Sequence, residues 1–65
     1  MSKLIEQIIR SRQAKKLSQA QFGEMLGLPQ SHISKIESGK TDLRLSSLIE
    51  MGRRLGLELV WVPQS

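Results

Sequence analysis

The chain has 65 residues, with ten Lys and Arg against six Asp and Glu and a formal net charge of +4. That length fits one small domain, which would bury only about 60% of its unfolded surface, so association with a partner would help to stabilise it. The absence of Cys and the presence of a single His exclude a disulfide framework and a thiolate zinc site. They also argue against a metal centre, so we expect no cofactor.

No apolar run approaches the length of a membrane span. The first ten residues, MSKLIEQIIR, carry charged groups where a signal peptide would have an unbroken hydrophobic core. We therefore expect a soluble cytoplasmic protein that binds no membrane. The sequence pI near 10.2 favours an acidic partner such as nucleic acid, although a charge of this size also serves solubility on small domains.

Residues 3–15 are predicted to form the first helix, because apolar residues recur there at helical spacing. The residues expected on its inner side are Leu4, Ile5, Ile8, Ile9 and Ala14.

The second helix is predicted over residues 19–26. Ser18 and Gln21 have the spacing of a capping box, and Leu17 and Phe22 flank it as a hydrophobic staple would. Gly27 is suited to closing the helix in the left-handed conformation. Gly23 lies inside the helix, where the missing Cβ would let another helix cross closely.

The third helix is predicted over residues 30–37, opened by Pro29 and ended by Gly39. Ile33 and Ile36 supply one apolar edge, and the opposite face is polar. Glu37 lies in the last turn, where its negative charge opposes the helix dipole, so we expect a compensating cation.

A loop follows, in which Thr41 or Asp42 is the expected cap for a fourth helix over residues 45–55. Glu50 and Arg54 are spaced as a favourable ion pair on that helix, and Gly56 would end it. The residues expected to be buried are Leu45, Leu48, Ile49, Gly52 and Leu55.

Residues 57–63 change to a two-residue period and end at Pro63, which predicts a β-strand. A lone strand leaves its backbone groups unpaired, so we expect it to pair with the same strand of a second copy, forming an antiparallel ribbon in a two-fold dimer. The alternative is an extended tail whose Leu59 and Trp61 pack on their own core. The predicted dimer-strand residues are Leu57, Leu59, Val60, Trp61 and Val62.

Two short helices joined by a tight turn, the second with a polar outer face, are typical of DNA-binding helix-turn-helix motifs. The chain resembles the lambda-repressor and Cro-like, or XRE-type, helix-turn-helix domains. The resemblance implies an all-α domain of four helices over residues 1–56, followed by the dimerising strand. The matching residues are Leu17-Ser18-Gln19, Phe22-Gly23, Leu26-Gly27, Gln30-Ser31, Ile33-Ser34-Lys35-Ile36-Glu37 and Gly39-Lys40, with looser similarity through Leu55-Gly56.

This family resemblance also implies specific side-chain roles. An Arg at the position of Arg12 would form a partly buried salt bridge with Glu37, tying the first helix to the third. Gln19 would contact phosphate and brace Gln30. Lys40 and Arg44 would add phosphate contacts.

If the third helix enters the major groove, its polar face can reach base edges, with Gln preferring adenine and Lys preferring guanine. His32 could bond a base or phosphate, or could face solvent. The expected base-reading residues are Gln30, Ser31, His32, Ser34 and Lys35.

The ending of the chain is similar to that of HipB-type antitoxins, which repress their own operon and bind a HipA-like Ser/Thr kinase toxin. This similarity implies a homodimeric repressor that acts at the nucleoid on an inverted-repeat operator. Only Pro63, Gln64 and Ser65 follow the strand, so we expect toxin neutralisation to use the folded surface or another subunit. The alternatives are a stand-alone XRE-type regulator and an interaction module that sequesters a protein partner. An enzyme is not expected, because no group of base, orienting residue and pocket can be argued.

Overall fold

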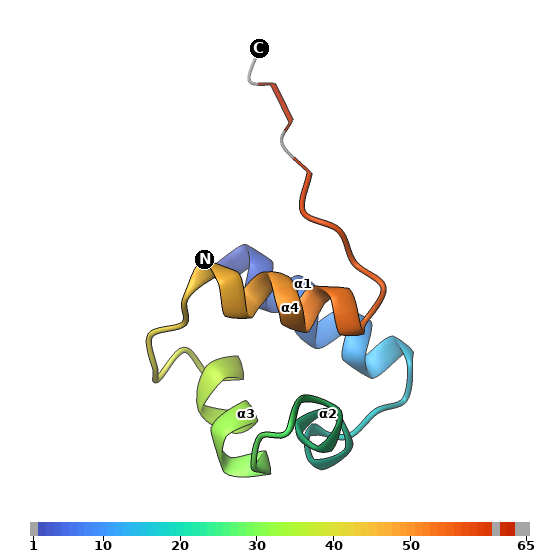
Figure 1. Ribbon diagram of the computed structural model, residues 1–65, viewed down its shortest axis with the longest axis vertical. Coiled ribbons are helices and arrows are strands. Elements are labelled where there is room, and N and C mark those ends of the chain that lie inside the picture. Colours follow the sequence, from blue (N-terminus) through green and yellow to red (C-terminus); the bar gives the residue numbers. More distant parts are fainter. Residues whose placement is uncertain (1, 61, 64–65) are drawn as a thin grey trace.

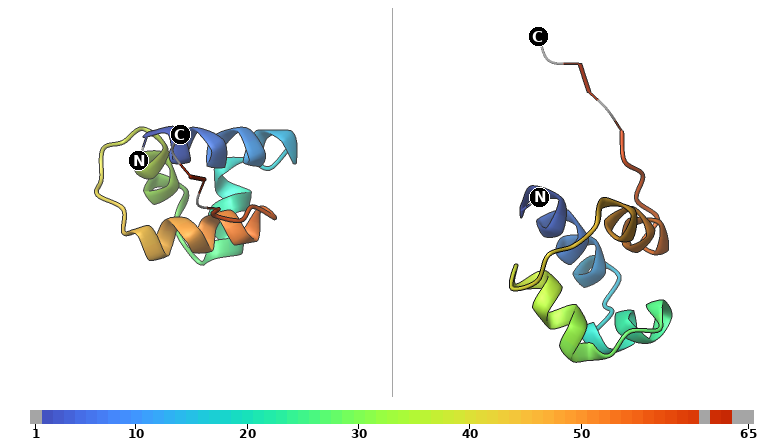
Figure 2. Two further views of the ribbon diagram at one scale, coloured as in Figure 1. Left: turned by 90° about the horizontal axis from the view of Figure 1, so that it is seen from above. Right: turned by 60° about the vertical axis from the view of Figure 1, so that its left-hand side comes forward.

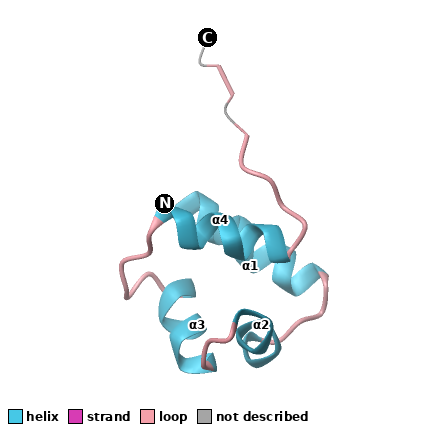
Figure 3. Ribbon diagram, viewed as in Figure 1, coloured by secondary structure: helices cyan, strands magenta, loops and turns pink. Residues whose placement is uncertain are grey.

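A computed structural model describes residues 2–60 and 62–63 of the chain. Within these residues the regular structure consists of four helices: α1 (Ser2–Ala14), α2 (Gln19–Leu26), α3 (Gln30–Glu37) and α4 (Leu45–Arg54) (Figure 1). The expected all-helical domain is therefore confirmed (Figure 3). None of the described helices is long and apolar enough to cross a lipid bilayer.

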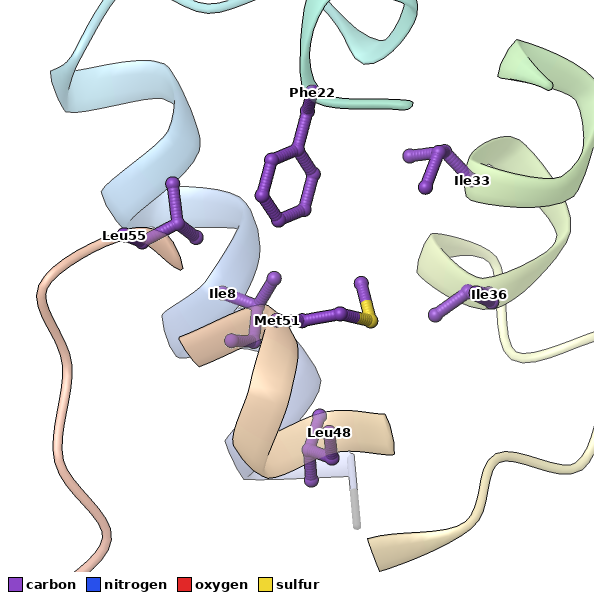
Figure 4. Close-up of a cluster of buried hydrophobic side chains, with 7 residues drawn as sticks. All are labelled: Ile8, Phe22, Ile33, Ile36, Leu48, Met51 and Leu55. Carbon is purple, nitrogen blue, oxygen red and sulfur yellow. The ribbon is translucent and has the colours of Figure 1, made fainter. Parts of the chain in front are cut away.

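One apolar core is shared by all four helices. Its side chains point toward one another between α1, α2, α3 and α4 (Figure 4). Phe22 of α2 and Ile33 of α3 are fully buried. The core therefore holds both helices against the rest of the domain. The buried members are Ile8, Phe22, Ile33, Ile36, Leu48, Met51 and Leu55.

The inner face of α4 differs from the expected one. Leu48, Met51 and Leu55 are buried, whereas Leu45 is 46% exposed because it opens the helix and lies in a shallow groove between α1 and α4 rather than in the core. Ile49 lines the same groove and is half-buried. Met51 was not expected in the core, although it lies one turn from Leu48 on the same face.

The inner face of α1 also differs from the expected one, since Ile9 is half-buried but is not among the residues packed against the core. Ile8 is buried, with Leu4 and Ile5 packed partly against the core. Ala14 is exposed, because α1 ends there and the chain turns away through Lys16, which takes a left-handed φ of 58°. The helix is thus one residue shorter at this end than predicted, and α4 likewise ends at Arg54.

The turn between α2 and α3 is tightly closed. The predicted capping box of Ser18 and Gln21 is present, and Gly27 ends α2 with a left-handed φ of 71°. Gly23 packs directly beneath the turn: a Cβ there would lie 2.5 Å from the carbonyl oxygen of Leu28 and 3.2 Å from Cγ1 of Ile33. The close approach expected at Gly23 is therefore confirmed.

The start of α4 contradicts the expected cap. Arg44 occupies the N-cap position, with φ −69° and ψ 145°, and no side chain caps the helix. Thr41 and Asp42 lie three and two residues before that position, so the loop continues past them to Arg44. The first backbone N–H groups of α4 are consequently left without a side-chain acceptor.

The described C-terminal residues, 57–60 and 62–63, form no strand. The strand was predicted to pair with a second copy, which a single chain does not supply, so the ribbon stays a prediction. Leu57 packs partly against the core and Leu59 lines the groove between α1 and α4, after which the segment leaves the helical body (Figures 1 and 2). Trp61 lies outside the described residues. It was expected either to join the ribbon between two copies or to pack on the core as part of a tail.

Candidate nucleic-acid interface

The helix α3 presents a polar outer face. Ile33 and Ile36 point into the core at 0% and 2% exposure, and each residue advances around the helix by about 100°. Ser31, Ser34 and Lys35 therefore lie on the side opposite the core, and all three are exposed. The structure thus brings these three predicted base-reading residues together on one face.

The two remaining predicted base-reading residues lie on opposite flanks of α3. Gln30 is on the α2 side, where its Nε2 donates a hydrogen bond to Oε1 of Gln19 at 3.1 Å. His32 is on the α4 side, where it lines a groove together with Ser46 and Glu50. Gln30 lies one turn before Ser34 and His32 lies one turn before Lys35, so the two residues border the exposed face of α3 from opposite flanks.

Arg12 and Glu37 form the ion pair that the family resemblance implies. Nε of Arg12 donates to Oε2 of Glu37 at 2.7 Å and Nη2 donates to Oε1 at 3.0 Å, so the contact is a two-pronged fork. The side chains are only 9% and 7% exposed. Nη1 of Arg12 also donates to the carbonyl oxygen of Leu17 at 2.7 Å, so one guanidinium links α1, the loop before α2 and α3.

A hydrogen bond between Gln19 and Glu37 joins the ion pair to the outer surface. Nε2 of Gln19 donates to Oε1 of Glu37 at 3.0 Å, while its Oε1 accepts from Gln30. The bond to Glu37 could not be predicted from the sequence, since the partners are 18 residues apart and on different helices. This bond completes a network of hydrogen-bonded side chains that runs from Arg12 through Glu37 and Gln19 to Gln30.

The predicted phosphate-contacting residues lie at or near the ends of helices. Gln19 opens α2 and is half-buried. Lys40 is exposed just after α3, where Gly39 turns the chain with a φ of 74°. Arg44 is exposed at the N-cap of α4. The positions of Lys40 and Arg44 place cationic side chains on the loop between α3 and α4, and their contact with phosphate stays a prediction.

The arrangement offers recognition chemistry. Amide, hydroxyl and ammonium groups on the outer face of α3 can donate to or accept from base edges. Among the described residues, no three His, Asp or Glu side chains are grouped so that they could hold a metal ion.

The fold and this surface define a helix-turn-helix domain, and the comparison of sequences gives the same result. The chain belongs to the helix-turn-helix family, whose model matches residues 8–62. The resemblance to XRE-type domains is thereby confirmed at the level of the family.

Two relatives share most of this chain. It is 41% identical over 61 residues to an "Uncharacterized HTH-type transcriptional regulator y4dL" of Sinorhizobium fredii, covering 94% of this chain and 31% of the relative. It is 38% identical over 60 residues to an "Uncharacterized HTH-type transcriptional regulator" of Haemophilus influenzae, covering 92% of this chain and 61% of the relative. The chain thus spans about a third and three fifths of these proteins. No solved structure gives a significant match.

Proposed function

We propose that the protein is a sequence-specific DNA-binding transcription regulator that inserts α3 into the major groove. The observation that carries this proposal is the outer face of α3, where Gln30, Ser31, Ser34 and Lys35 are all exposed over a fully buried Ile33. A major groove about 12 Å wide admits a helix of this kind. Membership in the helix-turn-helix family and the names of both relatives support the same function.

The chemistry of the exposed side chains suggests how bases are read. The amide of Gln30 can both donate to and accept from an adenine, and the ammonium group of Lys35 can donate to the acceptor atoms of a guanine. Lys40 lies beyond the end of α3. Its ammonium group is a compact charge with no planar arrangement of hydrogen-bond donors, so it suits a contact with phosphate. Base choice would therefore come from α3 and general affinity from the helix ends.

Alanine substitution tests this division. We expect Gln30→Ala and Lys35→Ala each to lower discrimination between a selected operator and random duplex DNA by about 1–3 kcal/mol. We expect Lys40→Ala to weaken binding to both duplexes about equally, because a phosphate contact carries no base information. Gel-shift titrations with both duplexes measure the ratio. Equal losses for all three variants would contradict the proposal.

The second part of the proposal is a two-fold dimer held by a C-terminal ribbon. Val60 and Val62 are 67% and 78% exposed, and the backbone beside them has no ladder partner in the described chain. Leu59 lies in an apolar groove with Leu4 and Leu45, so a second copy could cover this edge and pair with it. Such a dimer would present two α3 helices about 34 Å apart to an inverted-repeat operator, acting at the nucleoid in the cytoplasm.

The third part is an antitoxin role, which rests on the resemblance of the chain's ending to HipB-type proteins alone. The folded surface would then bind a HipA-like Ser/Thr kinase as well as DNA. Co-purification of such a kinase with the Lys35→Ala/Lys40→Ala variant would support this role. A stand-alone regulator would bind its operator with no kinase partner, and a pure interaction module would capture a partner while binding DNA weakly.

A further inference from the structure

The chain of hydrogen bonds beneath α3 has a fixed direction. An ionised carboxylate only accepts hydrogen bonds, and Oε1 of Glu37 accepts from both Arg12 and Gln19 at 3.0 Å. The amide of Gln19 must therefore turn its NH2 group toward Glu37, which leaves its oxygen facing α3. That oxygen accepts from Nε2 of Gln30 at 3.1 Å.

The hydrogen bond to Gln19 also sets the orientation of the Gln30 amide. Its NH2 group is held toward α2 by one hydrogen bond, and its Oε1 and its second N–H have no partner among the described residues. Adenine presents one acceptor and one donor in the major groove, and an amide matches them in only one orientation. An amide without the brace could turn by 180° and present the two groups in the reverse order.

We infer that Glu37 is a positioning residue for base recognition: it sets the orientation of the Gln30 amide through Gln19, and so the base preference at the pair that Gln30 reads. Glu37 lies beneath the surface with its side chain 7% exposed, so we expect it not to contact a base itself. This inference rests on the proposed insertion of α3 into the major groove. It assigns to the ion pair with Arg12 a role in specificity besides its structural one.

The main test removes the acceptor without leaving a buried charge. In the Arg12→Met/Glu37→Met variant both members of the ion pair are replaced by apolar side chains, an exchange that is often neutral for stability and leaves the net charge unchanged. The matched control is Glu50→Met/Arg54→Met, which removes the exposed pair of α4, whose Nε to Oε1 distance is 3.5 Å. Gln19→Met is a second test variant that keeps the ion pair intact. If the first variant does not fold in thermal unfolding experiments, an unchanged preference at the Gln30 pair in Gln19→Met would still overturn the inference.

The measurement is the relative affinity of each variant for duplexes that carry every single base-pair change in the selected operator. Gln30→Ala identifies the pair that Gln30 reads. We expect the Arg12→Met/Glu37→Met and Gln19→Met variants to lose about tenfold of the preference at that pair while preferences at the other pairs persist. The Glu50→Met/Arg54→Met control should keep the wild-type pattern.

Two results would overturn the inference while leaving the proposed function in place. One is a folded Arg12→Met/Glu37→Met variant with the wild-type preference at the Gln30 pair. The other is an equal loss of preference at every pair, which is the result expected if Glu37 only holds α1 to α3. A wild-type protein that prefers no duplex, or a Gln30→Ala variant that changes no pair, would instead overturn the proposed function.

Discussion

Arg44 has an unfavourable position for helix stability. It is the N-cap residue of α4, with an extended backbone and no side-chain hydrogen bond to the first turn. The partial positive charge of a helix N-terminus repels a cation, and the exposed N–H groups of the first turn lack an acceptor. The phosphate contact that we predict for Arg44 would give both groups a partner of opposite charge.

We therefore expect Arg44→Ser to stabilise the domain while weakening DNA binding. A Ser at this position can accept a hydrogen bond from the first turn, which is worth about 1 kcal/mol and about 4–8 °C in Tm. Losing one phosphate contact should reduce the slope of log affinity against log salt by about 0.9 per subunit. Thermal unfolding and salt titrations of DNA binding measure the two effects.

The control for this prediction is Arg53→Ser, which removes a cation from the last turn of the same helix. That cation interacts favourably with the helix dipole, so its loss should lower the stability slightly. A lower Tm for Arg44→Ser than for the wild-type protein would contradict the interpretation of Arg44.

Single residues also show where sequence reasoning ends. The capping box of Ser18 and Gln21 was predictable because its two partners are three residues apart. The hydrogen bond from Gln19 to Glu37 was not, because its geometry depends on how α2 and α3 cross. Arg44 was missed as the cap since Thr41 and Asp42 are better capping residue types, and only the path of the loop decides which residue stands at the helix start.

At the level of elements, the angle between α2 and α3 depends on Gly23. The backbone of the turn passes so close that a Cβ at Gly23 would lie 2.5 Å from the oxygen of Leu28, an atom that cannot move aside without opening the turn. The turn is also held by a hydrogen bond of 2.8 Å, which the N–H of Leu28 donates to the carbonyl oxygen of Gly23. The orientation of the recognition surface therefore depends on a missing side chain.

Alanine at two helical glycines should have opposite effects. We expect Gly23→Ala to lower the free energy of unfolding by about 1–3 kcal/mol, because overpacking against the turn outweighs the gain in helix propensity. We expect Gly52→Ala to raise it by up to about 1 kcal/mol, since its Cβ would meet Leu57 and Ile8 at ordinary contact distances of 3.5 and 3.7 Å.

Chemical denaturation of both variants measures this pair of effects. A stabilised Gly23→Ala variant would show that the turn can relax and that the close approach does not fix the angle of α3.

The elements differ in how far the sequence could predict them. The bounds of α2 and α3 depend on local signals, namely the capping residues, Pro29 and Gly27, and the structure has them at 19–26 and 30–37. The exposure of Leu45 depends on where α1 lies beside α4 and could not be read from periodicity. The segment from residue 57 has strand-like alternation, but a strand also needs a partner, which a single chain does not supply.

At the scale of the whole molecule, the helical body leaves its C-terminal segment uncovered. Val60 and Val62 are exposed apolar residues whose backbone has no ladder partner in the described part of the chain, and Leu59 just before them lines an apolar groove. A domain of this size also has a small core of its own, so burial of that edge in a dimer would add stability as well as symmetry.

A proline at Val60 tests the ribbon without removing much apolar surface. Val60→Pro deletes one backbone N–H donor from the proposed ladder, so we expect the protein to sediment as a monomer of 7.3 kDa rather than as a dimer of twice that mass. Val60→Thr is the control, since it keeps the N–H and the branched shape. Analytical ultracentrifugation distinguishes the two masses, and a wild-type protein that is monomeric at high concentration would exclude the ribbon.

The most direct test of the whole account is the affinity of the wild-type protein for duplexes selected from random DNA, compared with a scrambled duplex at the same salt concentration. If the exposed face of α3 reads bases, the selected site should be bound at least about 10³-fold more tightly, and its sequence should be an inverted repeat. Equal affinity for both duplexes, or no binding to either at low ionic strength, would contradict the account.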